Sequence, residues 1–246
     1  MAKPPKTVVL TGASRGIGHA TVRRFSEAGW RVITCSREEV PEECRRDSNW
    51  ADHIPTDLAD PESVAQFSDK ANALIGEQGL DALVNNAAQS PKTSYQERLG
   101  CLNGDLDGWR AVFELNFFAA LTLSRAFAGA LHRANGAIVN ITSIAGHATH
   151  PFAGSAYSTS KAALSALTRE MAVEFSELGV RVNAVAPGEI ATEMVGPEYE
   201  SLIPRIPLSR MGTSEEVAAV IFQLCQSDFG YVTGSEVFVT GGQHLL

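Results

Sequence analysis

The segment Thr11-Gly12-Ala13-Ser14-Arg15-Gly16-Ile17-Gly18 is the most informative stretch of the chain. It follows the apolar run 7–10 and leads directly into a stretch of helical period. Glycines at such spacing allow a tight turn, close approach of backbone amides to a pyrophosphate, and close helix–strand packing. A helix amino terminus adds the positive end of a dipole. A glycine-rich turn without a ligand is the alternative, but the strand–loop–helix setting favours a dinucleotide site.

Working outward from this loop, apolar β-branched runs alternate with longer segments of helical period. The runs predict strands at 7–10, 31–35, 81–84, 137–141, 181–185 and 237–239. The segments between them predict helices at 16–28, 61–76, 107–133, 155–177 and 214–227, the last opening on a capping-box pattern at Thr213–Glu216. Near-continuous apolar strands are typical of a parallel sheet covered on both faces. We therefore expect a Rossmann-type, doubly wound α/β fold in one domain spanning 1–246.

Two long irregular segments, 89–106 and 187–212, interrupt the alternation. Both follow predicted strands, so they should emerge at the carboxyl edge of the sheet, where ligands of such folds bind. Together with 144–155 they are the expected substrate loops. Their mixed content does not predict the substrate; it includes Phe152, Met194, Tyr199, Ile203, His147, His150, Glu193 and Glu198.

Composition excludes several classes of partner. Of the 246 residues, 44% are hydrophobic and 20% charged, as in globular proteins, and the net charge of −8 disfavours nucleic acid. Apolar runs such as 117–121 are too short to span a membrane. The first residues have no hydrophobic core of a signal peptide, and the four scattered cysteines suit free thiols. We expect a cytoplasmic protein with neither membrane nor nucleic-acid partners.

Tyr157 and Lys161 lie four residues apart in a predicted helix, so they share one face. A neighbouring ammonium favours the phenolate and lowers the pKa of a tyrosine, which suits acid–base catalysis. Ser143 follows the strand 137–141 and should reach the same edge of the sheet, where its hydroxyl could bind a substrate oxygen. The alternatives are a helix-surface Tyr–Lys pair and a serine that only caps local backbone.

These motifs, in this order, resemble the short-chain dehydrogenase/reductase family along essentially the whole chain. Asn85-Asn86-Ala87-Ala88 is similar to the family's Asn-Asn-Ala-Gly segment, with alanine in place of glycine. The ending Val239-Thr240-Gly241-Gly242 resembles 3-oxoacyl-acyl-carrier-protein reductases, and also relatives with other substrates. The resemblance implies an oxidoreductase in which Ser143 orients the substrate, Tyr157 exchanges the proton, Lys161 also binds the nicotinamide ribose, and Asn116 supports a water-linked proton relay.

The resulting site prediction has two parts. The catalytic residues are Asn116, Ser143, Tyr157 and Lys161. The expected cofactor contacts are Gly12, Ser14, Arg15, Gly16, Ile17, Gly18, Ser36, Arg37, Asp57, Leu58, Asn86, Ala87, Tyr157, Lys161, Pro187, Gly188, Ile190 and Thr192. Asp57 resembles the family acid at the adenine edge, although it could instead cap the helix that starts at Pro61. His147 and His150 are candidates for the substrate pocket or for plain loop residues, and we expect no metal site.

The second predicted strand indicates which dinucleotide binds. It ends in Thr34-Cys35-Ser36-Arg37, without the acid that selects NAD by binding the ribose hydroxyls. Arg37 can clamp a 2′-phosphate, and Arg15 adds a second positive charge. Glu38 and Glu39 follow, so Arg37 could instead be a surface arginine paired with them. The pattern favours NADP(H) over NAD(H).

We expect hydride transfer between NADP(H) and a carbonyl or alcohol substrate, with Tyr157 as general acid or base. The alternative is a catalytically silent dinucleotide-sensing regulator of the same fold. A homo-oligomer, most simply a twofold-symmetric tetramer, is also predicted, because the helix 107–133 is apolar on several sides and 155–177 presents small residues. The alternative is that loop 89–106 covers this apolar surplus within one chain.

Overall fold

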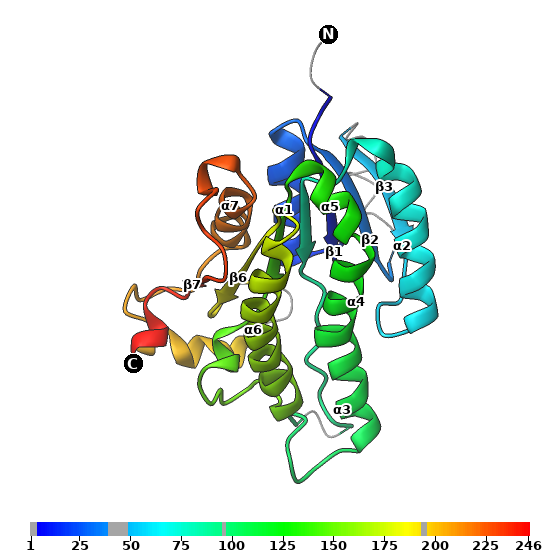
Figure 1. Cartoon of the computed structure of the whole chain (residues 1–246). Coiled ribbons are helices and arrows are strands. Elements are labelled where there is room, and N and C mark those ends of the chain that lie inside the picture. Colours follow the sequence, from blue (N-terminus) through cyan, green and yellow to red (C-terminus); the bar gives the residue numbers. More distant parts are fainter. Residues whose placement is uncertain (1–3, 39–48, 95–96, 193–195) are drawn as a thin grey trace.

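The computed structural model describes residues 4–38, 49–94, 97–192 and 196–246. Within these ranges, seven strands form one parallel sheet in the order β3-β2-β1-β4-β5-β6-β7 (Figure 1). The direction of growth reverses between β1 and β4, which is the switch point where open α/β sheets bind their ligands. The strands are β1 (Thr7–Thr11), β2 (Arg31–Ser36), β3 (Trp50–Pro55), β4 (Ala82–Asn85), β5 (Ala137–Ile141), β6 (Arg181–Pro187) and β7 (Glu236–Val239).

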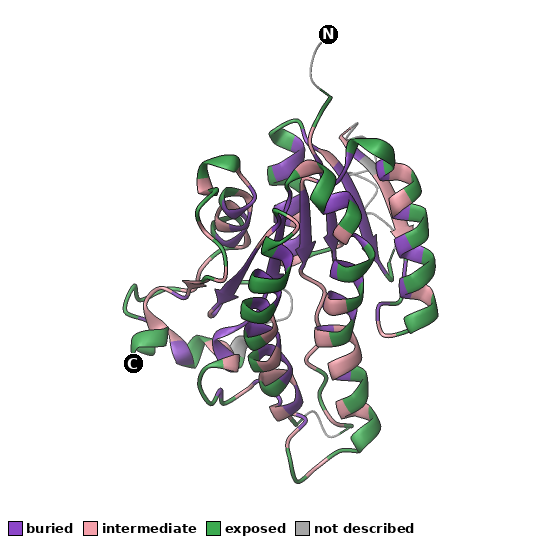
Figure 2. Ribbon diagram, viewed as in Figure 1, coloured by how far each residue is buried: buried purple, intermediate pink, exposed green. Residues whose placement is uncertain are grey.

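Helices cover both faces of this sheet, as the continuous apolar strands predict. Successive side chains of a strand point to opposite faces, so Val9 packs in one core cluster while Val8 and Leu10 pack in the other. The first cluster is completed by α2 (Pro61–Ile75), α4 (Ala119–Ala126), α5 (Ala128–Ala134) and α6 (Ser155–Ser176). The second is completed by α1 (Gly16–Glu27) and α7 (Ser214–Leu224). The purple interior of Figure 2 is this buried sheet.

Two predictions about the elements are wrong. The predicted strands omit β3, an edge strand that carries Asp52 and His53 and whose pairing with β2 is irregular at Val32/Ile33. Polar side chains on a half-covered edge give no continuous apolar run. The predicted helix 107–133 is not continuous: α3 (Leu106–Phe113) passes into a π-helix at Glu114–Phe118 and then α4, and the chain bends by 57° before α5. The capping box of α7 is present as predicted, between Thr213 and Glu216.

Among the described residues, no single helix is long and apolar enough to cross a membrane. The bent pair 106–126 and 128–134 passes that test by length and composition only. Cys35, Cys101 and Cys225 are free thiols, and Cys44 lies outside the described residues.

Candidate active site

The glycine loop turns sharply from β1 into α1 at the switch point of the sheet. Gly12 and Gly16 have φ of +69° and +54°, the left-handed region that glycine adopts without strain. No side chain of the described residues caps the first turn of α1. Its first amides, at the positive end of the helix dipole, are therefore available to an anion.

Close packing fixes the position of this loop. A Cβ on Gly18 would lie 1.9 Å from the carbonyl oxygen of Gly12, so no larger residue fits there. The side-chain amide of Asn86, just after β4, donates hydrogen bonds of 3.0 Å each to the carbonyl oxygens of Thr11 and Gly12. The close contact between Gly18 and Gly12 and the two hydrogen bonds from Asn86 thus fix the conformation of the loop.

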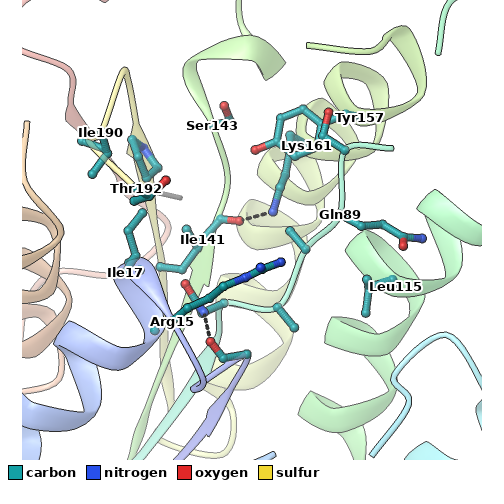
Figure 3. Close-up of a pocket in the computed structure, with 18 of the residues that line it drawn as sticks. Arg15, Ile17, Gln89, Leu115, Ile141, Ser143, Tyr157, Lys161, Ile190 and Thr192 are labelled. Carbon is teal, nitrogen blue, oxygen red and sulfur yellow. Dashed lines mark hydrogen bonds between the residues drawn. The ribbon is translucent and has the colours of Figure 1, made fainter. Parts of the chain in front are cut away.

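A cleft of about 420 Å³ opens above the loop along the carboxyl edge of the sheet. Figure 3 shows Arg15 and Ile17 from the glycine loop at one end and Ser143 with Tyr157 at the other. Of the predicted site residues, all but Asn116 line this cleft: Gly12, Ser14, Arg15, Gly16, Ile17, Gly18, Ser36, Arg37, Asp57, Leu58, Asn86, Ala87, Ser143, Tyr157, Lys161, Pro187, Gly188, Ile190 and Thr192.

The Ser143, Tyr157 and Lys161 side chains meet at the far end of the cleft. Ser143 precedes a short 3₁₀ turn and its hydroxyl accepts a hydrogen bond from the Ala145 amide at 3.2 Å. It also hydrogen-bonds Tyr157. The Lys161 ammonium lies 5.7 Å from the Tyr157 ring centroid and donates to the carbonyl oxygen of Ile141 at 2.6 Å, as Figure 3 shows. Both the local cap and the shared site predicted for Ser143 are therefore present.

The electrostatics of Tyr157 differ from the prediction. Burial raises the pKa of Tyr157, the hydrogen bond from Ser143 lowers it, and the Glu189 carboxylate raises it further. The expected lowering by Lys161 is absent, because that ammonium is turned toward Ile141 and burial lowers the pKa of Lys161 itself to about 7. The protein groups therefore hold Tyr157 as a neutral phenol, the form that donates a proton.

Asn116 lies outside the cleft, in the π-helix, and is buried. Its amide nitrogen donates to the Gln89 carbonyl oxygen at 3.0 Å and to the Ser160 hydroxyl at 3.1 Å, and its oxygen accepts from the Gln89 amide at 2.9 Å. Asn116 thus fastens the start of loop 89–106, where Gln89 lines the cleft. These contacts are those of a satisfied buried amide, and the relay role stays a prediction.

At the other end, the strand β2 delivers Ser36 and Arg37 to the cleft together with Glu38. The Ser36 hydroxyl donates to the Glu38 carbonyl oxygen at 2.7 Å, which tightens this turn. No ion pair joins Arg37 to Glu38 in the described ranges, and Glu39 lies outside them. The alternative interpretation of Asp57, as the cap of α2, is wrong, because Asp60 caps this helix. The Asp57 carboxylate instead accepts a hydrogen bond from the Ala59 amide within its own turn.

The substrate end contains a residue that the sequence interpretation missed. Glu189 directly follows Pro187-Gly188 and is buried in the cleft wall, hydrogen-bonded to His150 at 2.8 Å. The only sequence signal was an acid next to a family motif. His150, Phe152 and Tyr199 line the cleft as the loop prediction allows. His147, Ile203 and Glu198 do not, and Glu193 and Met194 lie outside the described residues.

His147 pairs instead with Glu236 of β7, at 3.1 Å. In the described part of the chain, no group of three or more His, Cys, Asp and Glu side chains could hold a metal ion.

Strand order, glycine loop and Ser–Tyr–Lys group together define a Rossmann-type dinucleotide-binding protein with an acid–base centre. Comparison with known proteins is consistent with this class. Residues 12–244 match the family model described as enoyl-(acyl carrier protein) reductase. The chain is 50% identical to Protein FixR of Bradyrhizobium diazoefficiens, over 98% of this chain and 87% of that protein.

Two solved structures extend the comparison. An oxidoreductase of the short-chain dehydrogenase/reductase family from Brucella ovis, in complex with a partially ordered NAD, is 47% identical with a TM-score of 0.83, covering 96% of this chain and 100% of that one. The Pseudomonas aeruginosa RhlG/NADP active-site complex is 30% identical with a TM-score of 0.85, covering 97% and 95%. The protein belongs to the short-chain dehydrogenase/reductase family, whose members are oxidoreductases that use a nicotinamide dinucleotide.

Proposed function

We propose that the protein is an NADP(H)-dependent reductase of a small carbonyl compound, with Tyr157 as the proton donor. One observation carries the proposal: a single cleft joins the uncapped amino terminus of α1 to the Ser143–Tyr157–Lys161 group. A phosphate-binding helix end and a proton donor at opposite ends of one cleft match an elongated dinucleotide whose reactive ring reaches the substrate.

The residues present fit such a cofactor. A Cβ on Gly16 would meet only Thr192, at 3.4 Å, so the surface above the loop is open to a pyrophosphate. When bound, NADPH supplies the hydride that the carbonyl carbon accepts. The Tyr157 phenol then transfers its proton to the carbonyl oxygen, giving the alcohol, and takes a proton back from solvent. Ser143 hydrogen-bonds that oxygen, and the Lys161 ammonium, which lines the same cleft, binds the nicotinamide ribose as the family resemblance implies.

The preference for NADP(H) is supported by the residues at the end of β2. Ser36 occupies the position after Cys35, and Arg37 and Arg15 both line that end of the cleft. A guanidinium can bind a 2′-phosphate through two parallel hydrogen bonds. Glu38 lines the same end and would repel the phosphate, and the Brucella ovis relative was solved with NAD. We infer that Arg37 and Arg15 outweigh the Glu38 carboxylate.

The decisive experiment is NADPH oxidation with a panel of ketones and aldehydes, run beside direct measurement of NADPH affinity. Turnover with any member that Tyr157→Phe abolishes supports the reductase. Tight NADPH binding with no turnover of any carbonyl compound contradicts it and favours the dinucleotide-sensing regulator, because a sensor does not need the proton donor.

We also propose that the protein forms a homo-oligomer, in its simplest form a tetramer. Phe118 at the end of the π-helix is 45% exposed and Val173 on α6 is 72% exposed. The chain's own loops therefore do not cover all of the apolar surface that the sequence predicts. Light scattering at micromolar concentration tests this: a stable mass near 26.3 kDa contradicts self-association, and a dimer leaves one interface only.

A further inference from the structure

Glu189 is a buried carboxylate in the wall of the cleft. It lies at the carboxyl end of β6, directly after Pro187-Gly188, and is 5% exposed. A buried acid is costly unless its charge is stabilised by hydrogen bonds. Its partners therefore show how its two oxygens are used.

One oxygen of Glu189 is fully engaged. Oε1 lies 2.8 Å from Nε2 of His150 and accepts a hydrogen bond of 3.2 Å from the Gln243 amide. Nδ1 of His150 accepts from the backbone amides of Phe152 and Ala153, at 3.2 and 3.0 Å. An imidazole nitrogen that accepts carries no proton, so the proton of His150 is on Nε2 and the ring is neutral. The His150–Glu189 pair keeps one net negative charge.

The other oxygen of Glu189 is left for a ligand. Oε2 makes no hydrogen bond to any residue that the structure describes. Oε2 is not fully buried, and because Glu189 lines the cleft, the exposed part of this oxygen opens onto the cleft. His150 and Gln243 hold the carboxylate so that this acceptor keeps a fixed direction.

The free acceptor lies in the same cleft as the reacting group. The Glu189 charge is close enough to raise the pKa of both Tyr157 and Tyr199. A fixed acceptor in a partly dehydrated cleft attracts a hydrogen-bond donor and repels a carboxylate or phosphate. Lys92 of loop 89–106 lines this cleft and is already paired with Glu198 at 3.6 Å.

We propose that Glu189 is a substrate-recognition residue, which accepts a hydrogen bond from a second hydroxyl group on the substrate. The preferred substrates are hydroxy ketones, and the diols they yield, rather than simple ketones, keto acids or phosphorylated carbonyl compounds. This inference rests on the proposed reductase function, and it places His150 and Gln243 as positioning residues for the carboxylate.

Matched substrates test the proposal without any mutation. Hydroxyacetone and methoxyacetone both carry an oxygen beside the carbonyl, and only hydroxyacetone has a donor; 2-hydroxycyclohexanone and 2-methoxycyclohexanone repeat the comparison on a ring. We expect kcat/KM to favour the hydroxyl compound at least tenfold, about 1.4 kcal/mol, and pyruvate to be poor. Equal values within both pairs overturn the proposal while leaving the reductase function standing.

Glu189→Gln gives a sharper test, because the site determines how the new amide is oriented. His150 and Gln243 both donate to Oε1, so the glutamine oxygen should take that place and its NH₂ group should face the cleft. The variant exchanges an acceptor for a donor. We expect the hydroxyl preference to disappear and pyruvate to improve. Glu200→Gln, an equal change at an exposed position that does not line the cleft, should alter neither ratio; an unchanged ratio in Glu189→Gln overturns the proposal.

A binding measurement tests the role of Glu189 even if the protein turns over none of these substrates. In Tyr157→Phe loaded with NADP⁺, cis-1,2-cyclohexanediol should bind more tightly than its monomethyl ether, and Glu189→Gln in the same background should remove the difference. Saturation-transfer NMR on the loaded protein measures this. Equal binding of the two alcohols overturns the role of Glu189 whether or not the reductase proposal stands, whereas failure of the carbonyl panel alone overturns only the reductase.

Discussion

The two ends of the cleft are built differently. At the cofactor end, six of the eighteen expected contacts come from one loop of eight residues, where glycines and a helix start present backbone amides. At the substrate end, His150, Phe152, Glu189 and Tyr199 come from segments far apart in the chain and are arranged by one another's side chains. The first end is a local property of sequence, and the second exists only once the fold is formed. Substitutions at the two ends should therefore have different effects.

The largest effect should come from Tyr157→Phe at the substrate end. The ring stays and only the proton donor is lost, so turnover should fall by about 10²-fold or more with NADPH affinity nearly unchanged. Steady-state kinetics and fluorescence titration with NADPH measure the two quantities. A variant that keeps most of its activity would show that Tyr157 is not the general acid.

At the cofactor end, Gly18→Ala should damage binding and stability together. Its Cβ would lie 1.9 Å from the Gly12 carbonyl oxygen, so the loop must shift. Overpacking of this kind costs about 1–3 kcal/mol. Gly129→Ala is the matched control, because this helical glycine has only the end of Arg133 nearby, at 3.8 Å. We expect it to be neutral or stabilising in thermal unfolding, and equal behaviour of the two variants would contradict the packing argument.

A third substitution tests whether Arg37, at the end of β2, determines the choice between NADPH and NADH. NADPH should bind at least tenfold more tightly than NADH, and Arg37→Asp should erase or invert the ratio, because a carboxylate repels the 2′-phosphate and accepts from the ribose hydroxyls. Arg23→Asp, an exposed site on α1 outside the cleft, makes the same charge change as a control. Equal affinities for the two cofactors in the unchanged protein would refute the assignment.

The smallest effect is a shift in pH dependence. Carbonyl reduction needs the Tyr157 phenol protonated, so activity is present below its pKa and is lost as pH rises through it. Glu189 raises this pKa, and Glu189→Gln should therefore move the alkaline limb of kcat/KM to lower pH. Ser143, Lys161, His150 and Tyr199 also face this region and are unchanged in the variant. Glu200→Gln removes an exposed carboxylate that is not among the groups acting on Tyr157 and should leave the limb in place.

The same contrast explains what sequence could predict. Apolar runs and the glycine loop predict the parallel sheet and its two covered faces, because these signals are local. The family resemblance adds the other expected cofactor contacts, and all of these residues line the cleft. The edge strand β3 is missed because its polar residues give no apolar run. Glu189 and the direction of the Tyr157 pKa are missed because both depend on which groups burial brings together. The resemblance to the family locates Ser143 and Tyr157, and it carries no information about the acid that faces them.

The π-helix at Glu114–Phe118 has a consequence for the length of this chain. A π turn closes its hydrogen bonds one residue later than an α turn, so the helix holds one surplus residue at this point. Deleting Leu115 would let regular α geometry run through this point, because the wider π turn accommodates a residue for which an α turn has no place. The turns on either side should keep their faces, with Val112 on one side and Ala119 and Leu123, which are packed in the core, on the other. A one-residue deletion in the regular α part of the helix would instead turn one half against the other by about 100°.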